Sequence, residues 1–432
     1  MLASAIWIMG SEKQNPLVKQ DCAIWKDWRL WVSVIVGLGL RLYHLADNSL
    51  WFDEGFSVAF ANADVPALLH KTLTVEPHPP TYYLILHYWI AAFGDSPAAI
   101  RMLSVIFGTA TIFLVFNIGA TLGDRRLGAV SSFLLAISPF HIQYSTEARM
   151  YGLLTFAGAL SVWGAALFMR NMARPPALRK ASVILVIGIS LAVASHNTGL
   201  LVWAAISTTL LIIWLVDSRP RPALLYGLVL NGIIAILFLC WLPLLLEDWQ
   251  IARTATNWMP PLGLKGAAEE LGRLFAPKVL EALSYRAGAV AAATVALIAL
   301  LGTYSWRYDR RAVLFCVLIG ILPIALSAAI SVAKPIFVAR IFLPSLIPLH
   351  LLIAHSDNRM SSPARAGKRY CYHRSSESGR PLRLLLLLAK GGLANCRIDD
   401  HDSNADARHR CRGQPSRRNR QYYRLLCAPI AK

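Results

Sequence analysis

Runs of apolar residues, each about as long as a membrane-spanning helix, recur along the chain with short polar segments between them. A helix needs about 20 apolar residues to cross a hydrocarbon core of about 30 Å, with a lower limit near 17. The pattern therefore predicts about ten crossings. They cover residues 30–45, 102–122, 127–144, 150–169, 181–195, 200–216, 223–246, 285–304, 312–332 and 335–354.

The composition indicates an all-α polytopic membrane protein. Of the 432 residues, 56% are hydrophobic and only 16% are charged, a ratio that excludes an ordinary soluble domain. The 43 Lys and Arg outnumber the 24 Asp and Glu. They lie in short clusters between apolar runs, which is typical of membrane topology and not of nucleic-acid binding. The seven cysteines form no CxxC pair, so neither a zinc site nor a disulfide framework is predicted.

One apolar segment, residues 81–94, decides the orientation of the chain. Its 14 residues reach only about 21 Å as a helix, which is too short to cross comfortably. We expect it to lie in the interface or to be re-entrant, because Tyr82, Tyr83, Tyr88 and Trp89 suit the headgroup region. If this segment does not cross, four loops that carry eleven Lys and Arg face the cytoplasm, as the positive-inside rule requires.

This orientation divides the chain into three parts. Residues 1–29 form a cytoplasmic amino-terminal segment, and residues 30–354 form the membrane domain, whose first outer loop covers residues 47–101. Residues 355–432 form a basic tail with 17 Lys and Arg against 6 Asp and Glu. The tail has two interpretations: a disordered segment drawn to anionic lipid, or the product of a shifted reading frame. We prefer the second, because its Arg, Ser and Cys follow no pattern.

The first outer loop carries the strongest candidate chemistry. Asp53 and Glu54 stand side by side in NSLWFDEGFS, and adjacent carboxylates at a membrane surface usually have a reason to be there. The alternative is that they are solvated loop acids. Farther along, two prolines after His78 stiffen the chain and bring its imidazole near the headgroups, where it can meet a phosphate. A loop histidine before a helix is the more ordinary interpretation.

More polar residues lie at the outer ends of later crossings. SPFHIQYSTEARMYGLL contains Glu147, Arg149 and Tyr151, and KPIFVARIFLP contains Lys334 and Arg340. Arginine is the natural partner of a phosphate or a carboxylate. The alternatives are that Glu147 and Arg149 form a structural ion pair and that Arg149 only snorkels.

Two further possibilities concern the same face. Arg41 lies near the outer end of the first crossing and would add another cation. Asp53, Glu54 and Glu147 could jointly hold a divalent cation, although carboxylates at this spacing more often hold none. The sequence leaves the metal undecided.

The order of these motifs resembles the bacterial GT-C glycosyltransferases of the protein O-mannosyltransferase-like family (family 39), which are related to the lipid A aminoarabinose transferases. FDE is followed by HPP and a YY-rich helix, then by Arg-x-x-Ser at residues 101–104 and by SPFHIQYSTEARMY. The resemblance is specific over residues 41–169, weaker near residue 340 and absent from the tail. It implies a GT-C fold with interfacial helices at the outer face of the bacterial inner membrane, and an active site that faces the periplasm.

The resemblance also implies roles for individual residues. An aspartate of the first outer loop is the catalytic base in that family, which maps onto Asp53 with Glu54 as its neighbour. In the related aminoarabinose transferases, the lysine of a KPP motif holds the donor phosphate, and the matching position here is His78. Because a neutral imidazole is a weaker anchor than an ammonium, the cations near the outer face would compensate.

These residues suffice for one reaction. A polyprenyl-phosphate sugar presents its anomeric carbon at the outer interface, where a carboxylate can deprotonate an acceptor hydroxyl or amine. Attack opposite the phosphate inverts the anomeric centre, and cations stabilise the leaving lipid phosphate. We therefore predict an inverting hexosyl- or pentosyltransferase that uses this donor and a glycan, lipid or protein acceptor.

Two other classes of protein share some of these features. A transporter or lipid flippase also carries intramembrane charges, but the sequence has no convincing internal repeat and its polar residues gather on one face. A structural membrane component fits the composition but leaves the clustering of FDE, HPP and EARMY unexplained.

The predicted orientation can be tested by cysteine labelling. A cysteine introduced between residues 47 and 79 should react with a membrane-impermeant maleimide in intact cells, because this loop faces outward if residues 81–94 do not cross. The unmodified chain, with its seven native cysteines, gives the background. Labelling only after permeabilisation would place the loop in the cytoplasm and remove the predicted chemistry.

Overall fold

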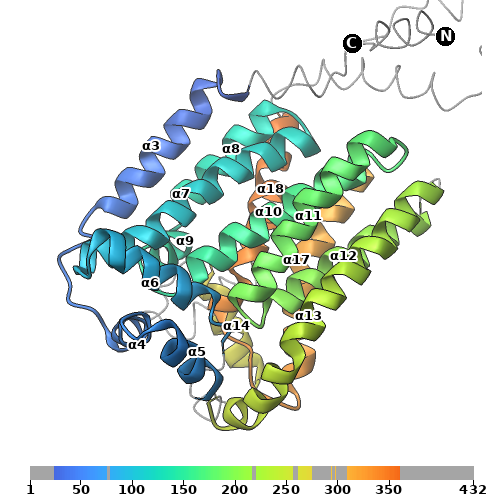
Figure 1. Ribbon diagram of the computed structural model, residues 1–432. Coiled ribbons are helices and arrows are strands. Elements are labelled where there is room, and N and C mark those ends of the chain that lie inside the picture. The colour runs from blue at the N-terminus through green and yellow to red at the C-terminus, as the bar shows by residue number, and fades with distance from the viewer. Residues whose placement is uncertain are drawn as a thin grey trace, which may run out of the picture. The chain divides into compact units, whose positions relative to one another are not determined.

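The computed structural model describes residues 24–74, 78–216, 220–255, 261–274 and 309–360, together with positions 293 and 297. Every regular element in these residues is helical (Figure 1). The predicted all-α architecture is therefore confirmed. Most of the amino-terminal segment, nearly all of the predicted crossing at 285–304 and most of the basic tail lie outside the described residues.

Six helices in the described part of the chain are long and apolar enough to cross a membrane. Each corresponds to one of the predicted crossings, and polar residues define where several of them begin. The Asp309 carboxylate, for example, accepts a hydrogen bond from the Ala312 backbone N–H at 3.1 Å, which satisfies a free donor at the helix start. The six are α7 (Pro97–Leu122), α10 (Tyr151–Arg170), α11 (Pro175–Ser195), α12 (Gly199–Val216), the first part of α13 (Arg221–Ala255) and α17 (Arg310–Ser331).

Two predicted crossings are shorter or begin later than expected. Helix α3 (Trp28–Leu42) has 15 residues. Helix α18 (Leu343–Met360) follows a 3-10 turn, η1 (Ala339–Phe342), so the crossing predicted from residue 335 starts several residues later.

The prediction of a single helix over residues 127–144 is wrong. The chain forms α8 (Arg125–Ala136) and then a separate helix, α9 (Pro139–Ser145). Pro139 explains the break, because proline lacks an N–H for the helix and disfavours a helical conformation at the preceding residue. Ser138 is accordingly extended, with φ −64° and ψ 115°.

Short helices cover one end of the bundle. Helices α4 (Phe52–Ala61), α5 (Val65–Thr74) and α14 (Leu264–Arg273) gather there (Figure 1), and α6 (Thr81–Phe93) packs against α4 and α7. We call this the site end of the bundle. Helices α10 and α12 begin at this end and α11 ends here. Residues at the start of α10 and at the end of α11 are therefore brought to the same end of the bundle.

Helix α6 matches the segment predicted to be too short to cross. It has 13 residues, and Tyr88 is 64% exposed, as expected for a ring at a membrane interface. The expectation that Tyr82 and Tyr83 also lie among headgroups is wrong. Both are fully buried in a hydrophobic cluster with residues of α4, α9 and α18, because this face of α6 packs on protein.

The opposite end of the bundle is held by a polar contact between three helix termini. The guanidinium of Arg170, at the end of α10, donates to the Leu122 carbonyl at the end of α7 and to the Asp309 carboxylate before α17. The Arg170–Asp309 pair is 2.9 Å long. We call this the basic end, because the Arg- and Lys-rich loops that were predicted to be cytoplasmic occur here.

Helices α10 and α11 approach each other through glycine. A Cβ at Gly164 would lie 2.6 Å from the Leu185 backbone nitrogen, and one at Gly188 would lie 2.5 Å from the Ser161 nitrogen. Small residues at such contacts let membrane helices pack backbone to backbone. The two glycines therefore fix the spacing of the helices that carry Tyr151 and His196.

Replacing Gly164 with leucine should disrupt this contact. Gly164→Leu should destabilise the protein by about 1–3 kcal/mol, the usual cost of overpacking, and should lower its thermal unfolding temperature in detergent. Gly39→Leu is the matched control, because a Cβ at Gly39 meets no atom within 4 Å. Equal unfolding temperatures for the two variants would contradict the close approach.

Candidate active site

A buried ion pair anchors the first turn of α4 to α7. Glu54 is fully buried, and Arg101 donates to both of its carboxylate oxygens, from Nε at 2.9 Å and from Nη2 at 2.7 Å. Such bidentate pairing is the strongest geometry available to these groups. Arg101 also donates to the backbone carbonyls that precede α4, at Leu45, Asn48 and Ser49. One guanidinium therefore shapes the loop and holds the carboxylate.

The same carboxylate holds the segment between α9 and α10. The Ala148 N–H donates to Glu54 Oε1 at 2.9 Å, and the Trp51 N–H donates to Oε2 at 3.3 Å. Both oxygens of Glu54 are thus occupied by donors. The sequence placed Glu54 beside the catalytic base, and these contacts favour a positioning role for it.

Asp53 differs sharply from its neighbour. Its side chain is partly exposed, and among the described residues no hydrogen bond or ion pair engages its carboxylate. Its backbone carbonyl accepts from the Ser57 hydroxyl at 3.0 Å, within α4. The helix therefore fixes the Asp53 backbone and leaves the carboxylate available.

Arg149 lies beside Asp53. Its side chain is buried and its Nη1 lies 3.4 Å from each of three oxygens, those of the Asp53 carbonyl, the Ser57 hydroxyl and the Tyr83 hydroxyl. The structure thus brings Arg149 to the start of α4, although nearly 100 residues separate them in the sequence. The guanidinium therefore places positive charge against the first turn of α4, which carries Asp53.

Aromatic rings and a second arginine complete the cluster. The rings of His78 and His196 lie 4.2 Å apart, and the ring of His196 lies 5.7 Å from that of Tyr151. The Arg340 guanidinium lies over the Tyr151 ring at 5.6 Å, within the range of a cation–π contact. His78, Tyr151 and Arg340, all predicted from the sequence, are therefore neighbours.

The two histidines are held in the neutral form. Burial lowers the pKa of His78 well below its usual value, and the charges of Arg149 and Arg340 lower it further. Burial and the same arginines lower the pKa of His196 to about 3. The positive charge of the cluster therefore comes from Arg149 and Arg340, and the imidazoles contribute neutral hydrogen-bonding groups.

Glu147 is a partly buried carboxyl whose protonated form is favoured by its surroundings. Burial raises its pKa to about 7, helped by the negative charge of Glu54 and opposed by a hydrogen bond from Gln143 and by Arg340 and Arg149. The Gln143 amide donates to Glu147 Oε1 at 3.2 Å. Burial therefore reduces the negative charge that Glu147 adds beside Arg149 and Arg340.

The segment that carries Arg340 is held by α14. The Glu270 carboxylate accepts from the Ala339 N–H at 2.6 Å and from the Arg273 guanidinium at 2.5 Å. Lys334 lies at the end of α17, in the partly exposed segment that leads to Arg340. Its predicted part in phosphate binding stays a prediction.

Arg41 lies apart from this cluster. It is fully buried and donates to the Gly37 carbonyl at 2.6 Å and to the Ala136 carbonyl at 3.2 Å, and its Nη2 lies 2.6 Å from His141 Nδ1. The expectation that Arg41 adds a cation to the outer face stays a prediction, and its hydrogen-bond partners are helix residues outside this cluster. It joins α3 to α8 and α9.

The proposed metal site has no support in the described residues. Among them, no group of three or more His, Cys, Asp and Glu side chains is placed to hold a metal ion. Glu54 gives the reason, because its two oxygens already accept hydrogen bonds from Arg101 and from two backbone N–H groups.

Sequence reasoning missed two contributors to the cluster. His196 follows α11 and Tyr83 lies in α6, so neither is near the acidic motif in sequence. The only sequence signal for His196 is its place after the crossing predicted over residues 181–195. Tyr83 was interpreted as an interfacial ring, whereas its hydroxyl lies 3.4 Å from Arg149.

Comparison with known proteins identifies the fold. No family model and no curated protein matches the chain. ArnT from Cupriavidus metallidurans matches in the apo state with a TM-score of 0.55 and 18% identity, over 78% of this chain and 60% of ArnT. Its structure bound to undecaprenyl phosphate matches with a TM-score of 0.55 and 16% identity, over 76% and 60%. The apo oligosaccharyltransferase of Archaeoglobus fulgidus gives 0.54 and 14% identity, over 84% and 54%.

Both of these proteins are glycosyltransferases of the GT-C fold. The chain therefore has the GT-C fold, as its sequence motifs implied. It spans 60% of the length of ArnT and 54% of the length of the oligosaccharyltransferase. At 14–18% sequence identity, the structural likeness establishes the fold alone.

The anchoring role of Glu54 can be tested by removing its charge. Glu54→Gln should destabilise the protein by about 3–5 kcal/mol, because it leaves the buried Arg101 guanidinium without a counter-charge. Thermal unfolding in detergent measures the loss. Glu269→Gln is the control, since its pair with Lys265 is 4.0 Å long and exposed and should matter by less than about 1 kcal/mol. Similar stability of the two variants would refute the anchor.

Proposed function

We propose that this protein is an inverting glycosyltransferase that moves a sugar from a polyprenyl-phosphate donor to an acceptor at the outer face of the bacterial inner membrane. The observation that carries the proposal is the contrast between two adjacent carboxylates. Glu54 is fully hydrogen-bonded, whereas the Asp53 carboxylate is free among the described residues, and Arg149 reaches the backbone carbonyl of Asp53. This is the arrangement of a positioned base next to an anion-binding group.

Asp53 is the base in this proposal. It accepts the proton of an acceptor hydroxyl or amine while the acceptor atom forms a bond to the anomeric carbon. The bond from that carbon to the phosphate oxygen breaks, and its electron pair leaves with the lipid phosphate. Because the acceptor attacks opposite the leaving group, the configuration at the anomeric carbon inverts.

Arg149 and Arg340 bind the phosphate. Each is placed to stabilise the negative charge that grows on the leaving group, an effect worth a few kcal/mol for a well-placed donor. His78, His196 and Tyr151 form a chain of neighbouring rings that leads to Arg340, and the neutral imidazoles offer N–H donors without adding charge. Lys334 is a further candidate for the same phosphate. The leaving phosphate is already anionic, so no general acid is needed.

The fold supports a lipid-linked donor. The ArnT structure that matches this chain was solved with undecaprenyl phosphate bound, and the site end of the bundle carries short helices suited to a membrane surface. An interfacial site lets the lipid stay in the bilayer while its sugar reaches Asp53. Lipid A, a surface polysaccharide, a glycolipid and a protein serine or threonine are the acceptor classes that such a site admits.

Asp53→Asn tests the base directly. Transfer of a radiolabelled sugar from polyprenyl phosphate in membrane vesicles should fall by about 10²–10⁴-fold, the usual contribution of a general base. Lipid-linked sugars that accumulate in a deletion strain, identified by mass spectrometry, supply the donor for this assay.

Asp95→Asn is the matched control. Asp95 is an exposed acid between α6 and α7 at the site end, and its removal should leave transfer unchanged. Full activity of Asp53→Asn would overturn the assignment. Movement of the lipid-linked sugar across the membrane without transfer would favour the transporter or flippase alternative.

A further inference from the structure

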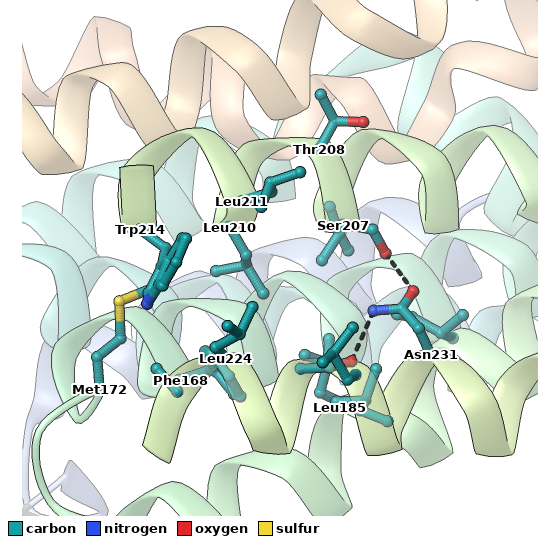
Figure 2. Close-up of a pocket in the computed structure, with 16 residues that line it drawn as sticks. Phe168, Met172, Leu185, Ser207, Thr208, Leu210, Leu211, Trp214, Leu224 and Asn231 are labelled. Atoms are coloured by element: carbon teal, nitrogen blue, oxygen red, sulfur yellow. Dashed lines mark hydrogen bonds between the residues drawn. The ribbon is translucent and has the colours of Figure 1, made fainter. Parts of the chain in front are cut away.

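A crevice lies among α10, α11, α12 and α13, well away from the proposed active site. It has a volume of about 290 Å³ and is lined mainly by apolar side chains (Figure 2). Met172 and Trp214 stand at one end, and Ser207 and Asn231 stand at the other. Phe168 lies near the carboxyl-terminal end of α10, the α12 lining residues run from its middle towards its carboxyl-terminal end, and the α13 residues come from its start.

The polar groups of the crevice satisfy one another. The Asn231 amide oxygen accepts from the Trp203 indole and the Ser207 hydroxyl, both at 2.8 Å, and its nitrogen donates to the Gly227 carbonyl at 2.8 Å. No charged residue lines the crevice within the described part of the chain. The walls therefore offer hydrocarbon contact and no site for a polar headgroup, which indicates a hydrocarbon chain as the occupant.

The volume suits part of a lipid chain. An apolar cavity of about 150 Å³ holds one benzene molecule, so about 290 Å³ has room for on the order of ten carbon atoms. Leu211 and Leu228, which line the crevice, are 49% and 63% exposed. These exposed leucines belong to membrane-spanning helices, so the crevice opens towards lipid.

The position of the crevice distinguishes it from the donor site. Phe168 lines it, and Tyr151 belongs to the active-site cluster. They are 17 residues apart on α10, which is about 25 Å along the helix. The crevice therefore lies in the half of the bundle near the basic end.

Four exposed cations lie on the basic-end side of the residues of α11 and α13 that line the crevice. Arg221 lies two residues before Ala223 on α13, and Lys180 lies five residues, or about 7.5 Å, before Leu185 on α11. Arg174 and Arg179 lie in the same region of α11 and its preceding loop. Among the described residues, no carboxylate forms an ion pair with any of them. Basic residues beside membrane helices attract anionic headgroups.

We propose that this crevice binds one acyl chain of an anionic phospholipid whose headgroup lies against Lys180 and Arg221. The apolar walls take the chain, and the cations supply the selectivity for negative charge. The lipid belongs to the leaflet at the basic end of the bundle and is a structural ligand, separate from the sugar donor.

Native mass spectrometry of the full chain provides the test. The protein is purified from nanodiscs that contain equal amounts of phosphatidylglycerol and phosphatidylcholine, and the retained lipid is counted. Wild type should keep one phosphatidylglycerol in preference to phosphatidylcholine. Gly227→Leu should reduce its retention at least about tenfold, the factor expected when a chain loses roughly two buried methylenes.

Glycine offers a matched pair for this test. Gly227 lines the crevice, whereas Gly232 on the same helix does not, and a Cβ at either position meets no atom within 4 Å. Gly232→Leu should therefore keep the lipid. Leu211→Trp fills the crevice from α12 and should repeat the loss. Unchanged thermal unfolding temperatures would show that the variants are folded.

Charge removal separates the headgroup from the chain. Lys180→Gln combined with Arg221→Gln should abolish the preference for phosphatidylglycerol while one phospholipid is still retained. Equal retention by Gly227→Leu and wild type would overturn the proposal, and so would an equal affinity of wild type for both lipids. Absence of any lipid from the wild type would also overturn it, because the proposed site would then hold no phospholipid.

Discussion

The proposed site depends on the buried pair between Glu54 and Arg101. Taking both charges out of water is costly, and here the cost is offset by two direct hydrogen bonds and by backbone partners on each side. The pair also sets the geometry of its neighbours. Asp53 is covalently next to Glu54, and Arg149 is next to Ala148, whose N–H donates to Glu54. The same carboxylate thus positions both Asp53, the proposed base, and Arg149, a proposed phosphate-binding residue.

Two carboxylates that are adjacent in sequence have different roles because the helix points them in different directions. In the first turn of α4, Glu54 faces the protein and Asp53 faces the partly open side. A buried carboxylate requires partners, and the four donors to Glu54 occupy the acceptor positions that a substrate proton would need. The carboxylate outside the core keeps that capacity. Burial therefore assigns Glu54 to structure and Asp53 to chemistry in the proposed mechanism.

The helices α10, α11 and α12 connect two different environments. At one end they carry Tyr151 and His196, beside the arginines of the proposed phosphate site. At the other end they line an apolar crevice and lie near exposed cations. Glycine contacts between α10 and α11 keep the helices close over the distance between these ends. The same three helices thus contribute to the proposed phosphate site at one end and to the proposed lipid site at the other.

The sequence by itself determined the elements whose cause is local. Apolar runs predicted the long helices, the shortness of residues 81–94 predicted a helix unable to cross, and the motif order indicated the GT-C fold. Tertiary structure decided the rest. The partner of Glu54 is 47 residues away and that of Tyr83 is 66 residues away, and no local pattern encodes such contacts. Burial of Tyr82, isolation of Arg41 and the inclusion of His196 follow from how the helices pack, because packing alone determines which face of each helix meets protein, lipid or substrate.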